Sequence, residues 1–213
     1  CALAVIYTRA TPVLVDVDEK TGNIDPGRIE EKISKRTKAI MVVHLYGHPA
    51  DMDPIMSLAK KYKIAVVEDA AEAHGAEYRG KKVGSIGKTG CFSFYANKII
   101  TTGEGGMLVT NDKKIYEKAV LLKDLAHSKK RRFLHEEIGF NYRMTNLQAA
   151  LGLAQLEERD KYIEKKLWIG DIYNKELSGI SNLELPIDEA FAKSVYWMYA
   201  IRVKKNNNIT KDE

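Results

Sequence analysis

The sequence predicts an α/β fold built around a mostly parallel sheet. Short apolar runs alternate with helical patterns through the first two-thirds of the chain, and this order of strands and helices is typical of parallel sheets. The run at residues 38–45 is almost continuously apolar, as expected of a strand covered on both faces. At 213 residues the chain is long enough for one good-sized domain and the start of another.

The first seventy residues contain the clearest strand signals. The chain opens on an apolar, strand-like run at residues 2–7, and further strands are predicted at residues 13–17, 38–45 and 64–67. The last of these runs directly into Glu68 and Asp69.

Two helices are predicted between these strands. Asp25-Pro26 and Asp53-Pro54 each place a capping aspartate before a proline, which is typical of a helix whose first residue is proline. Ile29 and Ile33 mark one apolar face of the first helix.

The pattern is less regular after Asp69. Residues 79–90 predict a loop or hairpin, and short strands are expected at residues 91–95 and 106–110. Asp112 opens a helix that runs to about residue 123. Thr145 and Gln148 have the spacing of a capping box and open a helical stretch of roughly thirty residues. We therefore expect a large domain at residues 1–178 and the beginning of a small α+β domain at residues 179–213.

Composition disfavours several other classes of protein. The 34 lysines and arginines are mixed with 29 acids, and the one dense basic cluster, residues 129–132, is typical of a solvated loop. We therefore expect no nucleic-acid partner. The sequence shows no signal-peptide pattern and no apolar run of membrane-spanning length, so no membrane partner is expected and the cytoplasm is the default location. Cys1 and Cys91 do not make a disulfide framework, and Cys91 is expected to be a small buried residue.

Asp69 and Lys98 are the residues whose positions point most directly to chemistry. Asp69 follows the carboxyl end of a buried strand, where open α/β sheets place their ligands, although a lone aspartate there is also a common cap or turn residue. Lys98 follows an apolar stretch and precedes the glycine-rich residues 102–106. Enclosure of this kind suits a reactive amine, whereas a lysine considered alone is more often a surface side chain.

The histidines give weaker signals. His44 and His48 are four residues apart, but Gly47 and Pro49 argue against a helix that would present both to a metal ion, so no metal site is expected. His74 either lines a site near Asp69 or packs as a structural residue, and both interpretations remain open.

Several stretches taken in order resemble one known family. They are PVLVDV at residues 12–17, HLYGHPADM at 44–52, VEDAAEAHG at 67–75, FSFYANK at 92–98, TGEGGM at 102–107 and GFNYRM at 139–144. Together they resemble the DegT/DnrJ/EryC1/StrS sugar aminotransferases, and within that family the perosamine synthase-like branch. The resemblance covers nearly the whole chain in unbroken order.

This resemblance implies a pyridoxal 5′-phosphate (PLP) transferase fold of type I, the aspartate aminotransferase fold. It further implies that Lys98 carries the cofactor and moves a proton during the reaction, while Asp69 pairs with the pyridine nitrogen. Ser93 matches the serine that contacts the cofactor phosphate, and Glu72 matches a position, often glutamine, near the cofactor ring. Asn141 would reach the phosphate of the neighbouring subunit's cofactor, so a homodimer with shared active sites is expected.

The resemblance also implies a reaction. A lysine at position 98, where some relatives carry histidine and dehydrate sugars, favours transamination. L-glutamate would be the amino donor and a nucleotide-linked 4-keto-6-deoxy sugar the acceptor, with amination at C4 preferred over C3. His135 and Tyr95 are the weaker candidates for contact with the sugar nucleotide. The products would serve polysaccharide or amino-sugar biosynthesis.

The chain also departs from the family pattern. Relatives begin upstream of Cys1, with a turn that binds the cofactor phosphate, and continue beyond Glu213, so part of the cofactor site is expected to lie outside these residues. Two alternatives remain open. The first is a non-catalytic member that acts as a binding or regulatory protein, which the retained Asp69 and Lys98 disfavour. The second is another PLP activity on the same fold, lyase or desulfurase chemistry, which the spacing around Asn141 disfavours.

Overall fold

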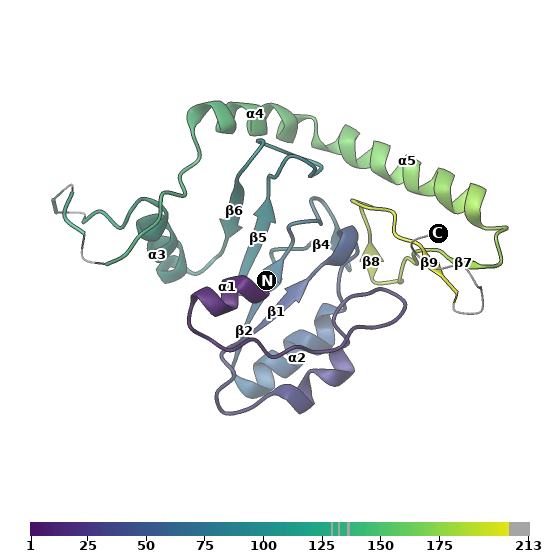
Figure 1. Cartoon of the computed structure of the whole chain (residues 1–213), viewed down its shortest axis with the longest axis horizontal. Coiled ribbons are helices and arrows are strands. Elements are labelled where there is room, and N and C mark those ends of the chain that lie inside the picture. The colour runs from purple at the N-terminus through teal and green to yellow at the C-terminus, as the bar shows by residue number, and fades with distance from the viewer. Residues whose placement is uncertain (129, 132, 136, 205–213) are drawn as a thin grey trace.

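A four-stranded sheet forms the centre of the computed structural model, which describes residues 1–128, 130–131, 133–135 and 137–204. Its strand order is β1-β2-β5-β6, from β1 (Ala39–Val43), β2 (Ala65–Asp69), β5 (Thr89–Ser93) and β6 (Gly106–Val109). The first three strands are parallel, and β6 runs antiparallel to β5 (Figure 1). The predicted, mostly parallel α/β sheet is therefore confirmed.

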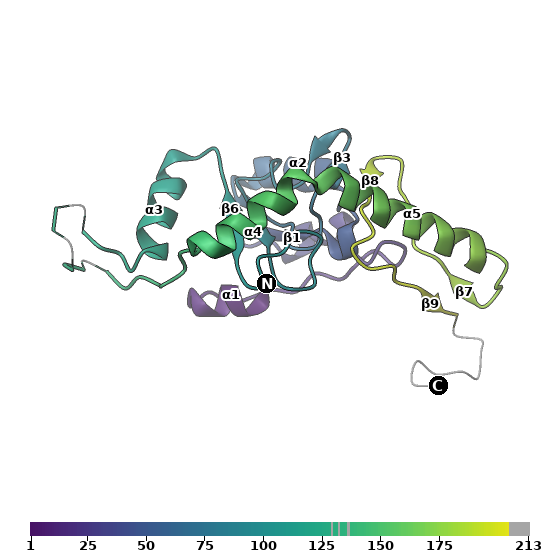
Figure 2. The same cartoon turned by 90° about the horizontal axis from the view of Figure 1, so that it is seen from above.

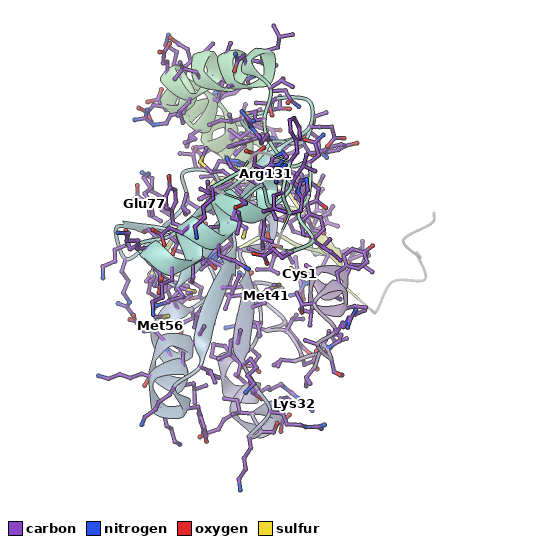
Figure 3. The ribbon with its side chains drawn as sticks, turned by 90° about the vertical axis from the view of Figure 1, so that its left-hand side faces the viewer. Cys1, Lys32, Met41, Met56, Glu77 and Arg131 are labelled. Atoms are coloured by element: carbon purple, nitrogen blue, oxygen red, sulfur yellow. The ribbon has the colours of Figure 1, made fainter. Side chains whose placement is uncertain are left out.

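Helix α2 (Met52–Tyr62) connects β1 to β2 and covers one face of the sheet. Its buried residues Met52, Ile55 and Ala59 belong to the same core cluster as Val42 and Val66 of the sheet. Figure 3 shows the neighbouring Met56 on α2 and Met41 on the strands beside it. Burying one stripe of a helix against a doubly covered strand is the packing that the apolar runs predict.

This helix begins two residues earlier than predicted, with Asp51 rather than Asp53 at its N-cap. Pro54 therefore lies third in the helix instead of first. Proline is tolerated throughout the first turn, because the N–H groups there have no carbonyl partner inside the helix. The Asp-Pro signal thus located the helix correctly but not its first residue.

The strand prediction for residues 2–7 is wrong, because these residues form helix α1 (Ala2–Tyr7). A short apolar run without periodicity fits a helix as well as a strand. The helix contains no buried residue and lies beside the sheet (Figure 1).

The strand at residues 13–17 is also absent, since the only pairing described there is an isolated bridge from Val17 to Ile24. The helix expected after Asp25 is replaced by two short 3-10 turns, Pro26–Arg28 and Glu30–Lys32. Ile29 is nevertheless buried in the core, and Ile33 packs against it. The apolar face was therefore predicted correctly, although the type of helix was not.

The second half of the chain builds the surroundings of the sheet. The hairpin expected at residues 79–90 is formed by β3 (Glu77–Tyr78) and β4 (Lys81–Lys82), and β8 (Ala192–Lys193) pairs with β3. Helix α3 (Lys113–Lys123) begins at its Asp112 cap, as predicted. Strands β7 (Leu183–Glu184) and β9 (Arg202–Val203) form a small separate ribbon.

The helical stretch of thirty residues is two helices, α4 (Asn146–Glu157) and α5 (Arg159–Leu177). The capping box at Thr145 and Gln148 is confirmed. The break occurs at Glu158, whose backbone angles of φ −99° and ψ 8° are not helical. Helix α4 lies over the end of β5 and β6, and α5 continues from it toward the C-terminal strands (Figures 1 and 2). The boundary between domains at residue 178 falls directly after α5 and remains a prediction.

The structure also bears on membrane-spanning helices, metal sites and the basic loop. No helix of the described residues is long and apolar enough to cross a membrane. The same residues contain no group of three or more side chains that could hold a metal ion. In the predicted basic loop, Lys130 and Arg131 are exposed, while Lys129 and Arg132 lie outside the described residues.

Candidate active site

The candidate site lies at the carboxyl edge of the parallel strands. The pairing of β1 with β2 ends at Val43 and Asp69, and the pairing of β2 with β5 includes Asp69 and Cys91. The segments that follow these three strands therefore meet at one edge of the sheet, where open α/β sheets place their ligands. They carry four of the predicted residues: Asp69, Glu72, Ser93 and Lys98.

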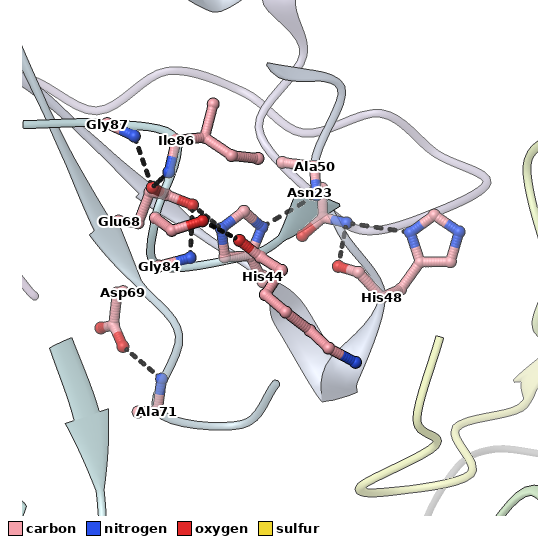
Figure 4. Close-up of polar contacts among 12 residues, drawn as sticks. Asn23, His44, His48, Ala50, Glu68, Asp69, Ala71, Gly84, Ile86 and Gly87 are labelled. Atoms are coloured by element: carbon pink, nitrogen blue, oxygen red, sulfur yellow. Dashed lines mark hydrogen bonds and ion pairs between the residues drawn. The ribbon is translucent and has the colours of Figure 1, made fainter. Parts of the chain in front are cut away.

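Asp69 is the last residue of β2, and its side chain is anchored at the turn that follows. Its Oδ1 accepts a hydrogen bond of 3.1 Å from the Ala71 N–H (Figure 4), and its Oδ2 accepts one of 2.7 Å from the Cys1 thiol. Burial and the nearby Asp69 charge both raise the pKa of the Cys91 thiol. Asp69 therefore places an anchored carboxylate at the sheet edge, and its pairing with a pyridine nitrogen stays a prediction.

Glu72 joins this turn to the segment after β1. Its Oε2 accepts a 2.8 Å hydrogen bond from the Tyr46 N–H, and its Oε1 lies 3.9 Å from the Lys98 Nζ. Tyr46 has φ 54° and ψ 16°, in the left-handed region that costs energy for a residue with a side chain. Glu72 thus holds a strained backbone with one oxygen and faces the lysine amine with the other.

Lys98 is enclosed rather than solvent-exposed. Its side chain is 10% exposed, and its Nζ lies 3.7 Å from the centroid of the Trp197 ring. Its backbone N–H donates to the Tyr95 carbonyl over 3.0 Å, so the residue ends a tight turn after β5. The surface alternative for this lysine is excluded by its burial.

Ser93 and Tyr95 lie at the start of the same turn. Ser93 is the last residue of β5, and its Oγ accepts a 3.3 Å hydrogen bond from the Tyr95 N–H. Tyr95 has an exposed side chain. The turn is attached to α4, because the Gln155 amide donates to and accepts from the backbone of Thr101. The segment after Lys98 is therefore held to α4 at Thr101, while the glycine-rich residues 103–106 are exposed.

His74 is packed among aromatic rings. Its ring lies 5.5 Å from that of Phe92 and 5.9 Å from that of Phe94, centroid to centroid. Among the described residues, neither of its buried nitrogens has a hydrogen-bond partner with normal geometry. Burial, and next the positive charge of Lys98, lower the pKa of His74 to about 4. The structure thus favours a neutral packed histidine over one that acts as a general acid or base near neutral pH.

Glu68 was missed by the sequence analysis, although it organises the edge of the sheet next to Asp69. Its carboxylate is fully buried and accepts hydrogen bonds from the His44 Nε2 and from three backbone N–H groups (Figure 4), those of Gly84, Ile86 and Gly87. Burial raises the pKa of Glu68, but these hydrogen bonds outweigh it and the net pKa is lowered. A charged residue inside an apolar strand was the signal that could have identified it.

The tautomer of His44 follows from its two partners. Its Nδ1 accepts a 3.1 Å hydrogen bond from the Ala50 N–H, so its Nε2 carries the proton that is donated to Glu68 over 3.0 Å. His48 instead contacts Asn23. The two histidines therefore have separate structural roles and are not paired for a metal ion.

Asn141 and His135 lie apart from this cluster, on the segment between α3 and α4. Asn141 is exposed and forms an isolated bridge with Asp124. His135 is exposed, donates from its Nδ1 to the Leu125 carbonyl, and packs on His127 at 4.6 Å. Figure 1 shows this segment extending away from the sheet. The roles predicted for both residues therefore stay predictions.

Comparison with known proteins identifies the family. The model of the DegT/DnrJ/EryC1/StrS aminotransferase family matches residues 1–213. The chain belongs to this family. It is 48% identical over 198 residues to GDP-perosamine synthase of Escherichia coli O157:H7, covering 93% of this chain and 54% of that protein. It is 47% identical over 213 residues to GDP-perosamine synthase of Caulobacter vibrioides, covering 100% of this chain and 57% of that protein.

Solved structures agree with this assignment. The structure of S. venezuelae DesV matches with a TM-score of 0.90 and 36% identity over 96% of this chain and 55% of that one. An aminotransferase from Psychrobacter cryohalolentis matches with a TM-score of 0.87 and 38% identity over 99% and 58% of the two chains. The predicted fold type I is therefore confirmed. The chain spans about half the length of the relatives it matches.

Proposed function

We propose that this chain is the cofactor-bearing part of a PLP-dependent aminotransferase that acts on a nucleotide-linked keto sugar. The observation that carries the proposal is the enclosed Lys98 amine, which lies at the same sheet edge as the anchored Asp69 carboxylate. Enclosing a lysine amine whose carboxylate neighbour, Glu72, lies at 3.9 Å is costly unless the amine is used chemically. Membership of an aminotransferase family supports that use.

The side chains at the sheet edge fit the functional groups of PLP. The cofactor has an aldehyde, a pyridine nitrogen and a phosphate, and the edge offers one enclosed amine, one anchored carboxylate and one hydroxyl. Lys98 would attach the cofactor, Asp69 would face the pyridine nitrogen and Ser93 would contact the phosphate. When bound, PLP supplies an electron sink next to the bond that is broken.

The chain's own residues would provide the acid–base work. The Asp69 carboxylate would keep a proton on the pyridine nitrogen, since an adjacent negative charge favours the protonated base. The Lys98 amine would take a proton from the substrate carbon and return it. Glu72 orients that amine, because its Oε1 faces the Lys98 Nζ while its Oε2 is held by Tyr46.

Two relatives are named GDP-perosamine synthase at 48% and 47% identity, which supports a nucleotide-linked sugar as substrate. We propose, from the family resemblance, a 4-keto-6-deoxyhexose as acceptor, amination at C4 and L-glutamate as donor. We further propose a homodimer in which Asn141 reaches the cofactor phosphate of the neighbouring subunit. The exposed position of Asn141 on an extended segment is consistent with that role. His135 and Tyr95, both exposed, are the proposed sugar-nucleotide contacts.

A visible absorption spectrum with added PLP tests the cofactor assignment. We expect a yellow band in the full-length protein, and borohydride reduction followed by peptide mapping should place the pyridoxyl group on Lys98. Lys98→Ala should abolish both results. Lys60→Ala, on the exposed face of α2, is the matched control and should change neither. A band that survives Lys98→Ala would contradict the assignment.

Adding amino donors separates the alternative functions. With a transaminase, L-glutamate should bleach the yellow band and release 2-oxoglutarate, and a nucleotide-linked 4-keto sugar should restore the band. A lyase or desulfurase would restore it without a keto sugar and would release a fragment of its amino-acid substrate. A protein with no band at all would favour the non-catalytic, binding or regulatory alternative.

A further inference from the structure

Trp197 contacts Lys98 from almost one hundred residues further along the chain. It lies between β8 and β9 and is 7% exposed. Its ring faces the Lys98 Nζ at 3.7 Å from the centroid, and its indole N–H donates a 2.9 Å hydrogen bond to the carbonyl of Asn97. One side chain thus contacts both the amine of Lys98 and the backbone next to it.

The backbone around Trp197 is held in place by two other elements. The Lys166 Nζ, on α5, donates a 2.9 Å hydrogen bond to the Trp197 carbonyl. Two residues earlier, the Val195 N–H donates to the Gly47 carbonyl over 3.1 Å, which attaches the same segment to the turn after β1. Trp197 is therefore positioned by the rest of the fold rather than by Lys98, as a residue that positions another side chain must be.

The contacts around the Lys98 amine are complementary to its charge. The face of an indole ring carries negative electrostatic potential and attracts an ammonium group, most strongly where water is excluded. The carboxylate of Glu72 lies 3.9 Å from the same nitrogen. Together the two groups favour one position of a long side chain that would otherwise sample many rotamers.

We propose that Trp197 is the positioning residue for Lys98. Its ring holds the amine in the site, and its N–H fixes the Asn97 carbonyl that precedes the lysine. The importance of this arrangement for catalysis rests on the proposed function, but the positioning itself is a property of the ligand-free protein. Because Trp197 belongs to the C-terminal segment, the placement of that segment and the placement of the amine are coupled.

Nuclear magnetic resonance of methylated lysines tests the contact directly. Lysine amines of the ligand-free protein are methylated with ¹³C-formaldehyde and cyanoborohydride, and the Lys98 signal is identified by its loss in Lys98→Arg. We expect that signal upfield of the other lysine signals, because its methyl groups lie over an aromatic face. Trp197→Leu should return it to the common region, whereas Trp168→Phe, at the exposed second tryptophan, should leave it shifted. A Lys98 signal in the common region in the parent would overturn the proposal.

The rate of methylation gives a second readout. Without the ring, the amine should react about thirtyfold faster in Trp197→Leu, the factor expected for loss of a desolvated cation–π contact. Trp197→Phe keeps an aromatic face but has no N–H, so its rate should lie nearer to that of the parent. The rates of the other lysines and the circular dichroism spectrum report whether each variant is folded. Equal Lys98 rates in the parent and in folded Trp197→Leu would contradict the proposal.

A third measurement does not require Trp197 to be replaced. In a Trp168→Phe background the fluorescence comes from Trp197 alone. Lys98→Met should change that emission, and Lys60→Met should not. Unchanged emission in Lys98→Met would overturn the contact even if Trp197→Leu failed to fold. Failure to bind PLP with these results intact would instead refute the proposed function and leave the positioning role of Trp197 standing.

Discussion

The buried ring of His74 should make the protein less stable in mild acid. The residue is 6% exposed, and among the described residues neither of its ring nitrogens has a hydrogen-bond partner with normal geometry. Burial and the charge of Lys98 lower its pKa from 6.5 to about 4. The folded protein therefore resists protonation of this ring, whereas the unfolded chain does not.

The size and sign of the effect follow from this difference in pKa. Below pH 6.5 the unfolded chain binds a proton at His74 that the folded protein does not bind until the pH approaches 4. The unfolded state then holds more protons, so stability falls as the pH is lowered through this window. With about 1.4 kcal/mol per pKa unit, the loss between pH 7 and pH 4.5 is ~2.5 kcal/mol.

Urea unfolding of the parent and of His74→Leu at a series of pH values measures this loss. The variant cannot be protonated at position 74, so the parent should lose ~2.5 kcal/mol relative to it between pH 7 and pH 4.5. His135→Asn, at an exposed histidine, is the control and should follow the parent. Parallel curves for the parent and His74→Leu would refute the reasoning.

Three further predictions concern the free energy of unfolding, measured by urea denaturation. Glu68→Gln exchanges an acceptor for a donor and leaves a buried backbone N–H unpaired. It should therefore lower the free energy of unfolding by ~2–4 kcal/mol. An equal loss in the exposed Glu30→Gln would contradict this. Gly90→Ala places its Cβ 2.1 Å from the Gly84 carbonyl oxygen and should cost ~3 kcal/mol, whereas Gly179→Ala, with no atom within 4 Å, should cost far less. Thr145→Ala removes the capping box of α4 and should cost ~1 kcal/mol, with Thr145→Ser retaining most of it; equal losses in the two variants would argue against the cap.

The sequence by itself determined the features that consecutive residues encode. The strands β1, β2 and β5, the Asp112 cap and the capping box at Thr145 were all predicted from local patterns and are confirmed. Each depends on the apolar character or on the hydrogen bonds of residues a few positions apart. The carboxyl edge that carries Asp69 and Lys98 follows from the same strand order.

Local patterns failed where a neighbour decides the conformation. The apolar residues 2–7 form a helix and residues 13–17 no strand, because an apolar run becomes a strand only where another strand is placed to pair with it. Pro26 begins a 3-10 turn instead of an α-helix, and the core is filled by Ile29, directly after that turn, with Ile33 packed against it.

Only the tertiary structure determined which side chains surround the candidate site residues and Glu68. Trp197 contacts Lys98 from 99 positions further along the chain. Glu68 contacts His44, which follows β1, and the backbone of residues 84–87, which precede β5. No periodicity or spacing in the chain encodes these contacts, because they exist only once the parallel strands, α5 and the C-terminal segment are packed together. The sequence therefore indicated the candidate site residues, and the packing of distant segments determined which side chains surround them.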